Sequence, residues 1–165
     1  MNTKHNNNVK KTIVHVDMTL SNNVTEKEGI IFLLDNHTGF FKIDLNTKKE
    51  LLDLLKIERR YLQSFDLIYV PNMVGKTINS DFLKTYLEDI IFVELKTTKK
   101  YLPENPKGFF FGATENEFNF GKILNDKFLF CFVTLNEKAP SFVLLSIDEL
   151  ENRIRNKRIQ YQITL

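Results

Sequence analysis

Apolar residues along the chain fall into short runs separated by polar and turn residues, a pattern typical of an α/β protein. Four runs have the length and the aromatic and β-branched content of buried strands: 65–70, 108–114, 127–135 and 141–146. Three other segments repeat apolar residues at helical spacing: 47–63, 114–124 and 147–159. The order of these elements predicts an α/β fold with a central mixed sheet flanked by helices.

The first 45 residues lack the alternation of strands and helices that the rest of the chain predicts. Residues 1–11 (MNTKHNNNVKK) are rich in Asn and Lys and show no periodicity, which predicts a disordered tail. Two apolar runs follow, at 11–20 and 29–45, and turn residues at 35–39 interrupt the second one so that it could form a hairpin. We therefore expect an N-terminal β layer over residues 12–45, in front of a core at 47–135 and a C-terminal strand and helix at 136–165, all within a single domain.

Residues 78–98 (INSDFLKTYLEDIIFVELKTT) allow two interpretations. In a β-hairpin with its loop at residues 87–88, Asp81 lies directly opposite Glu94, about 5 Å away at Cβ. Lys96 shares that face because strand side chains alternate with a period of two. This hairpin brings two carboxylates and an amine together.

The same residues also fit a helix over the first part of this segment. Phe82, Leu83 and Tyr86 have helical spacing, and Ser80 is a suitable N-cap. Asp81 would then lie in the first turn, and the acid next to Glu94 would be Asp89 or Asp66. The pattern favours the hairpin and leaves both interpretations open.

Composition narrows the functional classes only in part. The single cysteine, Cys131, excludes a disulfide framework and a Cys-rich zinc site, and it fits a reducing cytoplasm. The net charge of +2 and a pI near 8.5 permit nucleic-acid binding without indicating it, since dedicated basic binders lie above about pI 9. No apolar run approaches the roughly 18 residues of a membrane span, so we expect neither a membrane segment nor secretion.

Glu94 and Lys96 are the residues whose placement most suggests chemistry. They stand two residues apart in a strand-like run that is otherwise apolar, and burying an unpaired charge costs several kcal/mol. Two close carboxylates repel each other unless a cation separates them, and their oxygens suit Mg²⁺ or Mn²⁺. A neighbouring lysine can orient or deprotonate an attacking water and offset the charge on a phosphate. This combination indicates phosphodiester hydrolysis.

Asp81 followed by Glu94-Leu95-Lys96 resembles the motif of the PD-(D/E)xK nuclease superfamily. The downstream residues resemble Mrr-related domains and a family of unknown function often found at the C-terminus of larger proteins, in which a lysine-bearing strand precedes an F-F-x-T-x-N-E phrase and a D-x-Y-x-x-Y-x-V strand. The residues that match this pattern are Phe110, Thr114, Asn116, Glu117, Asp126 and Phe128.

The resemblance covers residues 47–135 and implies a restriction-endonuclease-like fold. It further implies that Asp81 and Glu94 bind the metal, with the Leu95 carbonyl as a third ligand, and that Lys96 is catalytic. One departure is Ser80, which stands where the superfamily commonly has proline.

Several other residues have both a functional and a structural interpretation. Glu117 can support the site or close a capping box that starts at Thr114, and Glu58 can support the site or lie on a solvated helix face. The expected phosphate contacts are Lys76, Thr97, Lys99 and Lys100. The late basic residues are either a solvated helix end or a further phosphate contact: Arg153, Arg155, Lys157 and Arg158.

The sequence thus predicts a magnesium- or manganese-dependent endonuclease that acts on DNA, in restriction or defence, as a cytoplasmic homodimer without membrane association. The alternative is a catalytically inactive nuclease fold that serves as a DNA-binding or accessory subunit.

Overall fold

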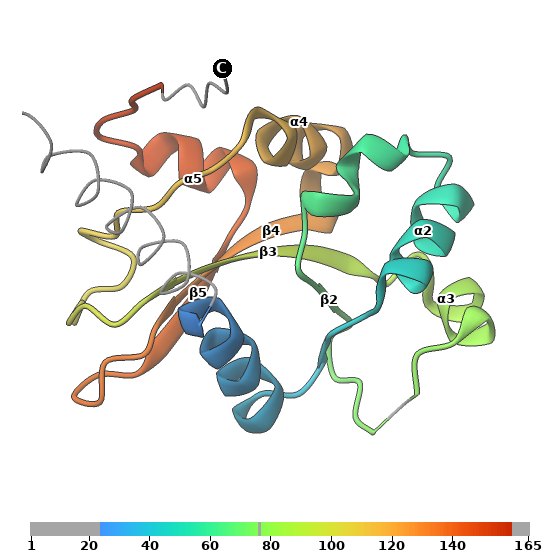
Figure 1. The fold of residues 1–165 in the computed structure, drawn as a ribbon, viewed down its shortest axis with the longest axis horizontal. Helices are drawn as coiled ribbons and strands as arrows, with labels where there is room; N and C mark the ends of the chain where they lie inside the picture. Colours follow the sequence, from blue (N-terminus) through green and yellow to red (C-terminus); the bar gives the residue numbers. More distant parts are fainter. Residues whose placement is uncertain (1–23, 76, 160–165) are drawn as a thin grey trace, which may run out of the picture.

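The computed structural model describes residues 24–75 and 77–159, which fold around one five-stranded sheet (Figure 1). The strands are β1 (Phe40–Phe41), β2 (Leu67–Tyr69), β3 (Ile91–Thr98), β4 (Phe128–Thr134) and β5 (Ser141–Leu145), in the spatial order β1-β2-β3-β4-β5. β3 and β4 run parallel, whereas the other neighbouring strands pair antiparallel. The predicted α/β fold with a central mixed sheet is confirmed at this level.

Helices lie on both faces of the sheet. Residues 24–36 are helical and cover one face, and the helices α2, α4 and α5 lie over the other (Figure 1). The helices with their bounds are α2 (Leu45–Leu54), α3 (Ser80–Tyr86), α4 (Glu115–Leu124) and α5 (Ile147–Arg153), with 3₁₀ turns η1 (Arg59–Gln63) and η2 (Asn125–Lys127). No helix among the described residues is long and apolar enough to cross a membrane.

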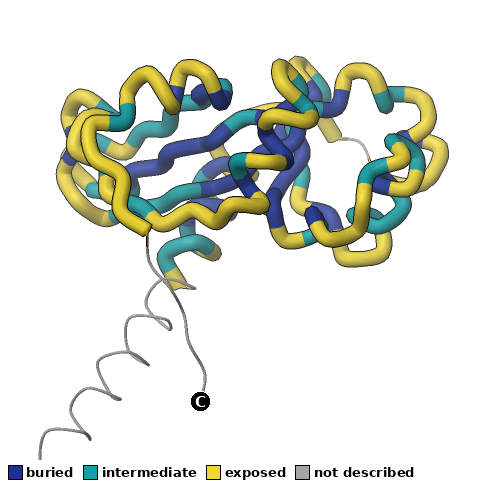
Figure 2. The backbone as a smooth tube through the Cα atoms, turned by 90° about the horizontal axis from the view of Figure 1, so that it is seen from above, coloured by how far each residue is buried: buried dark blue, intermediate teal, exposed yellow. Residues whose placement is uncertain are grey.

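Alternation along the central strands sends side chains into two separate cores. Phe128, Phe130 and Phe132 of β4 enter a large aromatic core beneath α4, whereas Cys131 and Val133 enter a smaller core beneath the 24–36 helix. β4 over most of its length and β3 over residues 92–95 are therefore buried on both faces, and such buried segments form the dark blue centre of the tube in Figure 2. A strand buried on both faces holds its side chains in fixed positions, which is what a catalytic or binding site needs.

The predicted N-terminal β layer is wrong over the part that the structure describes. Residues 24–36 form a helix, because Gly29, Ile30 and Leu33 recur at helical spacing and face the sheet, while Ile31 is exposed. A short continuous apolar run does not by itself distinguish a buried strand from a helix. Of the predicted hairpin only the short strand β1 forms, and residues 1–23 lie outside the described part of the chain.

The hairpin prediction for residues 78–98 is also wrong. Ser80–Tyr86 form helix α3, whose N-cap is Asn79, and the Asn79 side chain accepts a hydrogen bond from the Phe82 amide at 2.8 Å. The antiparallel neighbour of β3 is β2, so no strand carries Asp81 opposite Glu94. The hydrophobic side chains of α3 gain burial in the large core, and Asp81 is left exposed in the first helical turn.

Three smaller boundary predictions also change. The helix predicted at 147–159 ends at Arg153, so Arg155, Lys157 and Arg158 lie beyond it. The predicted helix 47–63 divides into α2 and η1, and α2 begins after Asp44, whose carboxylate accepts a hydrogen bond from the Thr47 amide at 2.7 Å. Residues 108–114 form no strand, although Phe109 and Phe111 still pack against the core. The strands predicted at 65–70, 127–135 and 141–146 are confirmed within a few residues at each end.

Gly29 lets the N-terminal helix approach β3 closely. A Cβ atom at position 29 would lie 2.2 Å from the Cγ2 atom of Thr97. We expect Gly29→Ala to be neutral or destabilising even though alanine favours a helix by about 1 kcal/mol over glycine. In a Thr97→Ser background, which lacks Cγ2, the same change should stabilise. Urea denaturation of the four proteins would measure this coupling, expected at about 1–2 kcal/mol, and additive effects would contradict the close approach.

Candidate functional site

The candidate site lies where β2 and β3 part. β2 pairs with β3 only through residues 91–93, while β4 continues beside β3 to Thr98. At the point of separation the Asp66 amide donates to the Val93 carbonyl at 2.9 Å, and the Asp66 carboxylate accepts from the Leu95 amide at 2.8 Å. The Asp66 side chain thus replaces the missing strand backbone and is held next to Glu94.

Glu94 and Lys96 project from β3 on the face that carries the large core. The Lys96 Nζ atom donates to a Glu94 carboxylate oxygen at 2.7 Å and to a Glu117 carboxylate oxygen at 2.9 Å. Glu94 and Glu117 are only 5% and 6% exposed. Lys96 therefore lies between two buried carboxylates, one from its own strand and one from helix α4.

Glu117 reaches this position because of how α4 begins. The N-cap is Thr114, whose hydroxyl accepts a hydrogen bond from the Glu117 amide at 3.2 Å. The predicted capping box is thus formed only in part, because the Glu117 side chain does not close it. The Glu117 carboxylate contacts Lys96. The cap fixes the backbone of the first turn, and the turn then directs an acidic side chain into the site.

The electrostatics of Glu94 are unfavourable without a further cation. Burial raises the pKa of the Glu94 carboxyl well above its ordinary value, and repulsion from Asp66 and Glu117 adds to the effect against the attraction of Lys96. The second carboxylate oxygen, Oε2, is buried and has no hydrogen-bond partner among the described residues. This oxygen is free to bind a ligand.

Lys96 is held in its charged form. Burial alone would lower the pKa of the ammonium group, but Glu94 and Glu117 outweigh this effect and raise the pKa above its ordinary value. At neutral pH Lys96 is therefore a fixed positive charge and a hydrogen-bond donor, not a free amine.

Two further charged residues act on the site and were not distinguished by the sequence. Lys48 of α2 donates through Nζ to the Phe65 carbonyl and, at 3.5 Å, to the Leu62 carbonyl. Burial lowers the pKa of Lys48, against the attraction of Asp66, Glu94 and Glu26. This lysine therefore adds positive charge next to the segment that carries Asp66.

Glu26, on the N-terminal helix, belongs to the same electrostatic group. Burial raises the pKa of its carboxyl, and repulsion from Asp66 adds to the rise, while Lys96 is the strongest of the opposing charges. The sequence does not identify Glu26 or Lys48 as site residues. Their surroundings, TEKE at 25–28 and TKKE at 47–50, resemble the solvated first turn of many helices.

The other predicted site residues lie apart from this group. Asp81 and Asp89 are exposed on and just after α3, and Glu58 is exposed and pairs with Arg60 at 3.4 Å. Of the two acids that the helical interpretation offered, Asp66 is the one beside Glu94.

The residues predicted to contact phosphate differ in their exposure and in their partners. Lys99 pairs with Glu28 at 2.6 Å, Lys100 is exposed, and Thr97 is half-buried against Gly29. Lys76 lies outside the described residues. Only Lys100 is open to a phosphate without first giving up a charged partner or a packed position.

The donor atoms fit a magnesium-type ion with few protein ligands. Among residues 24–75 and 77–159 no three Cys, His, Asp or Glu side chains are already arranged as a metal cage. Mg²⁺, however, commonly binds through one or two carboxylates and completes its shell with water and substrate phosphate. Asp66 and the unpaired Oε2 of Glu94 supply carboxylate oxygens of that kind.

Comparison of the chain with protein-family models, with curated proteins and with solved structures gave no match. The geometry of the site therefore carries the functional conclusion.

Proposed function

We propose that the protein is a metal-dependent nuclease of restriction-endonuclease-like fold that hydrolyses DNA phosphodiester bonds, with Asp66, Glu94 and Lys96 as its central residues. The observation that carries the proposal is the placement of the Asp66 carboxylate beside Glu94 and Lys96 where β2 leaves β3. The proposal includes a homodimer that cuts both strands and a role in restriction or defence.

The structure supports a PD-(D/E)xK-like site with one change in its composition. Glu94 and Lys96 lie on a central strand of a mixed sheet, as the resemblance implies. The first acid is Asp66 rather than Asp81, since Asp66 repels Glu94 and Asp81 is exposed on α3. The sequence distance between the two acids increases, but the chemistry is unchanged.

The chain's own residues would divide the work as follows. Asp66 and Glu94 would hold Mg²⁺ or Mn²⁺, with the Leu95 carbonyl as a further ligand. The bound ion would polarise a phosphoryl oxygen and lower the pKa of a coordinated water. Lys96, charged and fixed by Glu117, would orient the attacking water and stabilise the negative charge that develops on the phosphate. Its raised pKa argues against a role as general base.

One observation favours a second candidate, a binding-only nuclease fold. Lys96 already bridges Glu94 and Glu117 at hydrogen-bonding distance, so the three residues form a paired network without a metal. A residual ion pair of this kind could serve only to stabilise a DNA-binding or accessory subunit. Metal binding distinguishes the two candidates.

Cleavage of supercoiled plasmid and of a mixed oligonucleotide set tests the proposed activity. We expect cutting with Mg²⁺ or Mn²⁺ and none with EDTA. Asp66→Asn, Glu94→Gln and Lys96→Ala should each lower the rate by roughly 100-fold or more, because each removes a charge that acts on the transition state. Asp81→Asn is the matched control and should cut like the wild type. Loss of cutting in Asp81→Asn with full activity in Asp66→Asn would refute the assignment.

Thermal unfolding with added metal tests the site without any substrate. At 100 times its dissociation constant, Mg²⁺ or Mn²⁺ should stabilise the protein by about 2.7 kcal/mol, a rise in Tm of roughly 5–10 °C. The rise should be smaller at pH 5 than at pH 7.5, because the raised pKa of Glu94 makes protons compete with the metal. Glu94→Gln should abolish the rise. A metal-independent Tm in the wild type would favour the binding-only candidate.

The destabilisation of the metal-free fold by ionised Glu94 can also be measured. Because its pKa is raised in the folded state, the folded protein holds this proton more tightly than the unfolded chain does. Stability contributed by protonated Glu94 is therefore lost as the pH rises from the ordinary value near 4.5 through the raised value. Glu94→Gln should thus gain stability relative to the wild type as the pH rises, in urea titrations with EDTA. Glu115→Gln, at an exposed position, is the control. If the stability of the wild type and of Glu94→Gln changed in parallel with pH, ionised Glu94 would not destabilise the fold.

A further inference from the structure

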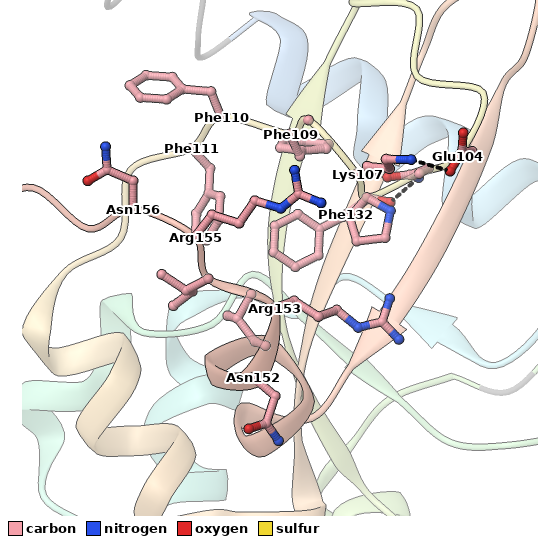
Figure 3. A pocket seen from close by; sticks show the side chains of 15 residues that line it. Glu104, Lys107, Phe109, Phe110, Phe111, Phe132, Asn152, Arg153, Arg155 and Asn156 are labelled. Carbon is pink, nitrogen blue, oxygen red and sulfur yellow. Dashed lines mark hydrogen bonds and ion pairs between the residues drawn. The ribbon is translucent and has the colours of Figure 1, made fainter.

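A second concave feature lies next to the proposed nuclease site. A cavity of about 770 Å³ is bounded by residues 104–111, by Phe132 of β4 and by the chain from Leu150 to Asn156 (Figure 3). A cavity of this size accommodates a ligand of several hundred daltons. None of the acidic residues Glu26, Asp66, Glu94 and Glu117 lines it, so it is distinct from the proposed metal site.

One wall residue of the cavity, Phe132, lies beside Lys96 in the sheet. Phe132 is the register partner of Lys96 across the parallel β3–β4 pair, so the two side chains leave adjacent strands on the same face of the sheet. A ligand that lies on Phe132 is therefore one strand away from the lysine proposed to act on a phosphate.

Three consecutive phenylalanines form the aromatic part of the cavity. Phe109 and Phe111 each pack edge-to-face on Phe132, with ring centroids 5.0 Å apart. Phe110, between these two anchored rings, is 92% exposed and points outward at the rim (Figure 3). A large apolar ring held in solvent by well-packed neighbours offers a flat surface for stacking.

Cations line the opposite side. The Arg155 side chain extends toward Phe109 and Phe132 in Figure 3, and Arg153 lies on the same segment. Neither arginine forms an ion pair with another described residue, whereas the nearby Lys107 is paired with Glu104 at 2.8 Å. The lining of the cavity therefore carries an excess of positive charge.

A polar group without a partner completes the lining. The Asn105 side chain donates through Nδ2 to the Phe132 carbonyl at 3.0 Å and to the Ser141 hydroxyl at 3.3 Å. Its Oδ1 atom is buried and has no hydrogen-bond partner among the described residues. This oxygen can accept a hydrogen bond from a ligand.

We propose that this cavity binds an unpaired nucleotide of a single-stranded segment of DNA, which continues to the site at Lys96. The base stacks on Phe110 at the rim, while Arg153 and Arg155 bind the backbone phosphates. Stacking on an aromatic side chain requires a base that has left the duplex, so the inference, which rests on the proposed nuclease function, assigns the frayed or opened segment of the DNA substrate to this cavity.

Fluorescence anisotropy of labelled oligonucleotides tests the inference without any cleavage. Binding of a 12-nucleotide single strand and of the same strand in a duplex is measured in EDTA, for the wild type and for Phe110→Ala, Phe110→Trp and Arg155→Gln. Phe110→Ala should weaken single-strand binding about 5- to 100-fold, and Phe110→Trp should retain it. Arg155→Gln should weaken binding and reduce the slope of log affinity against log salt by about one. Duplex binding should change less than about twofold in all variants.

Matched controls come from exposed residues outside the cavity: Tyr101→Ala for the aromatic ring and Lys138→Gln for the charge. Both should bind like the wild type. Unchanged single-strand binding in Phe110→Ala and Arg155→Gln would overturn the inference, as would equal affinity for the duplex. It would also be overturned if single-strand binding appeared only after removal of residues 160–165, because the chain's own end would then occupy the cavity.

The binding test of the cavity can fail or succeed independently of the cleavage test of the nuclease proposal. Glu94→Gln should abolish cleavage and leave single-strand binding intact. Binding that depends on Phe110 without any cleavage would uphold the cavity assignment and reject the enzyme. Cleavage that is indifferent to Phe110 and to strandedness would uphold the enzyme and reject the cavity assignment.

Discussion

The paired hydrogen bonds of Lys96 to Glu94 and Glu117 are the interaction on which the site depends. They tie a central strand to the first turn of α4 across the large core, and they keep an ammonium group charged in a place where burial disfavours charge. Replacing Lys96 would leave two buried carboxylates facing each other without a cation, a change that commonly costs several kcal/mol in a protein interior. The network nevertheless leaves one buried oxygen of Glu94 unpaired.

That unpaired oxygen is the main structural argument for a bound cation at the site. A fold selected only for stability would neutralise or replace a carboxylate that burial and two like charges disfavour. An unpaired, buried carboxylate oxygen beside Asp66 is what the proposed cation-binding site requires and what a purely structural ion pair does not. The aromatic core around Phe92, Phe120 and Phe128 supplies the rigidity that keeps the charges in place.

Much of the site could be predicted from the sequence, but its first acid could not. Glu94 and Lys96 were identifiable because charges in an apolar strand need an explanation, and Glu117 because a capping motif places it at a helix start. The helical interpretation offered Asp66 only as one of two alternatives, and the structure selects it, since its role depends on where β2 begins and on a side chain that replaces strand backbone. The error at Asp81 arose because SDFLKTY has both strand-like and helix-like spacing, and burial of Phe82 and Leu83 against the core decides for the helix.

The parallel pairing of β3 and β4 determines how much of the chain is needed to form the site. Parallel neighbours need a long crossover connection, and here that connection contains α4 and delivers Glu117 to Lys96. The same connection carries the three phenylalanines at 109–111. A fragment that stops before β4 would contain the full acid-and-lysine motif and yet lack the neighbouring strand that holds β3 in place. The acid-and-lysine motif therefore lies within residues 66–117, whereas the working unit also includes β4.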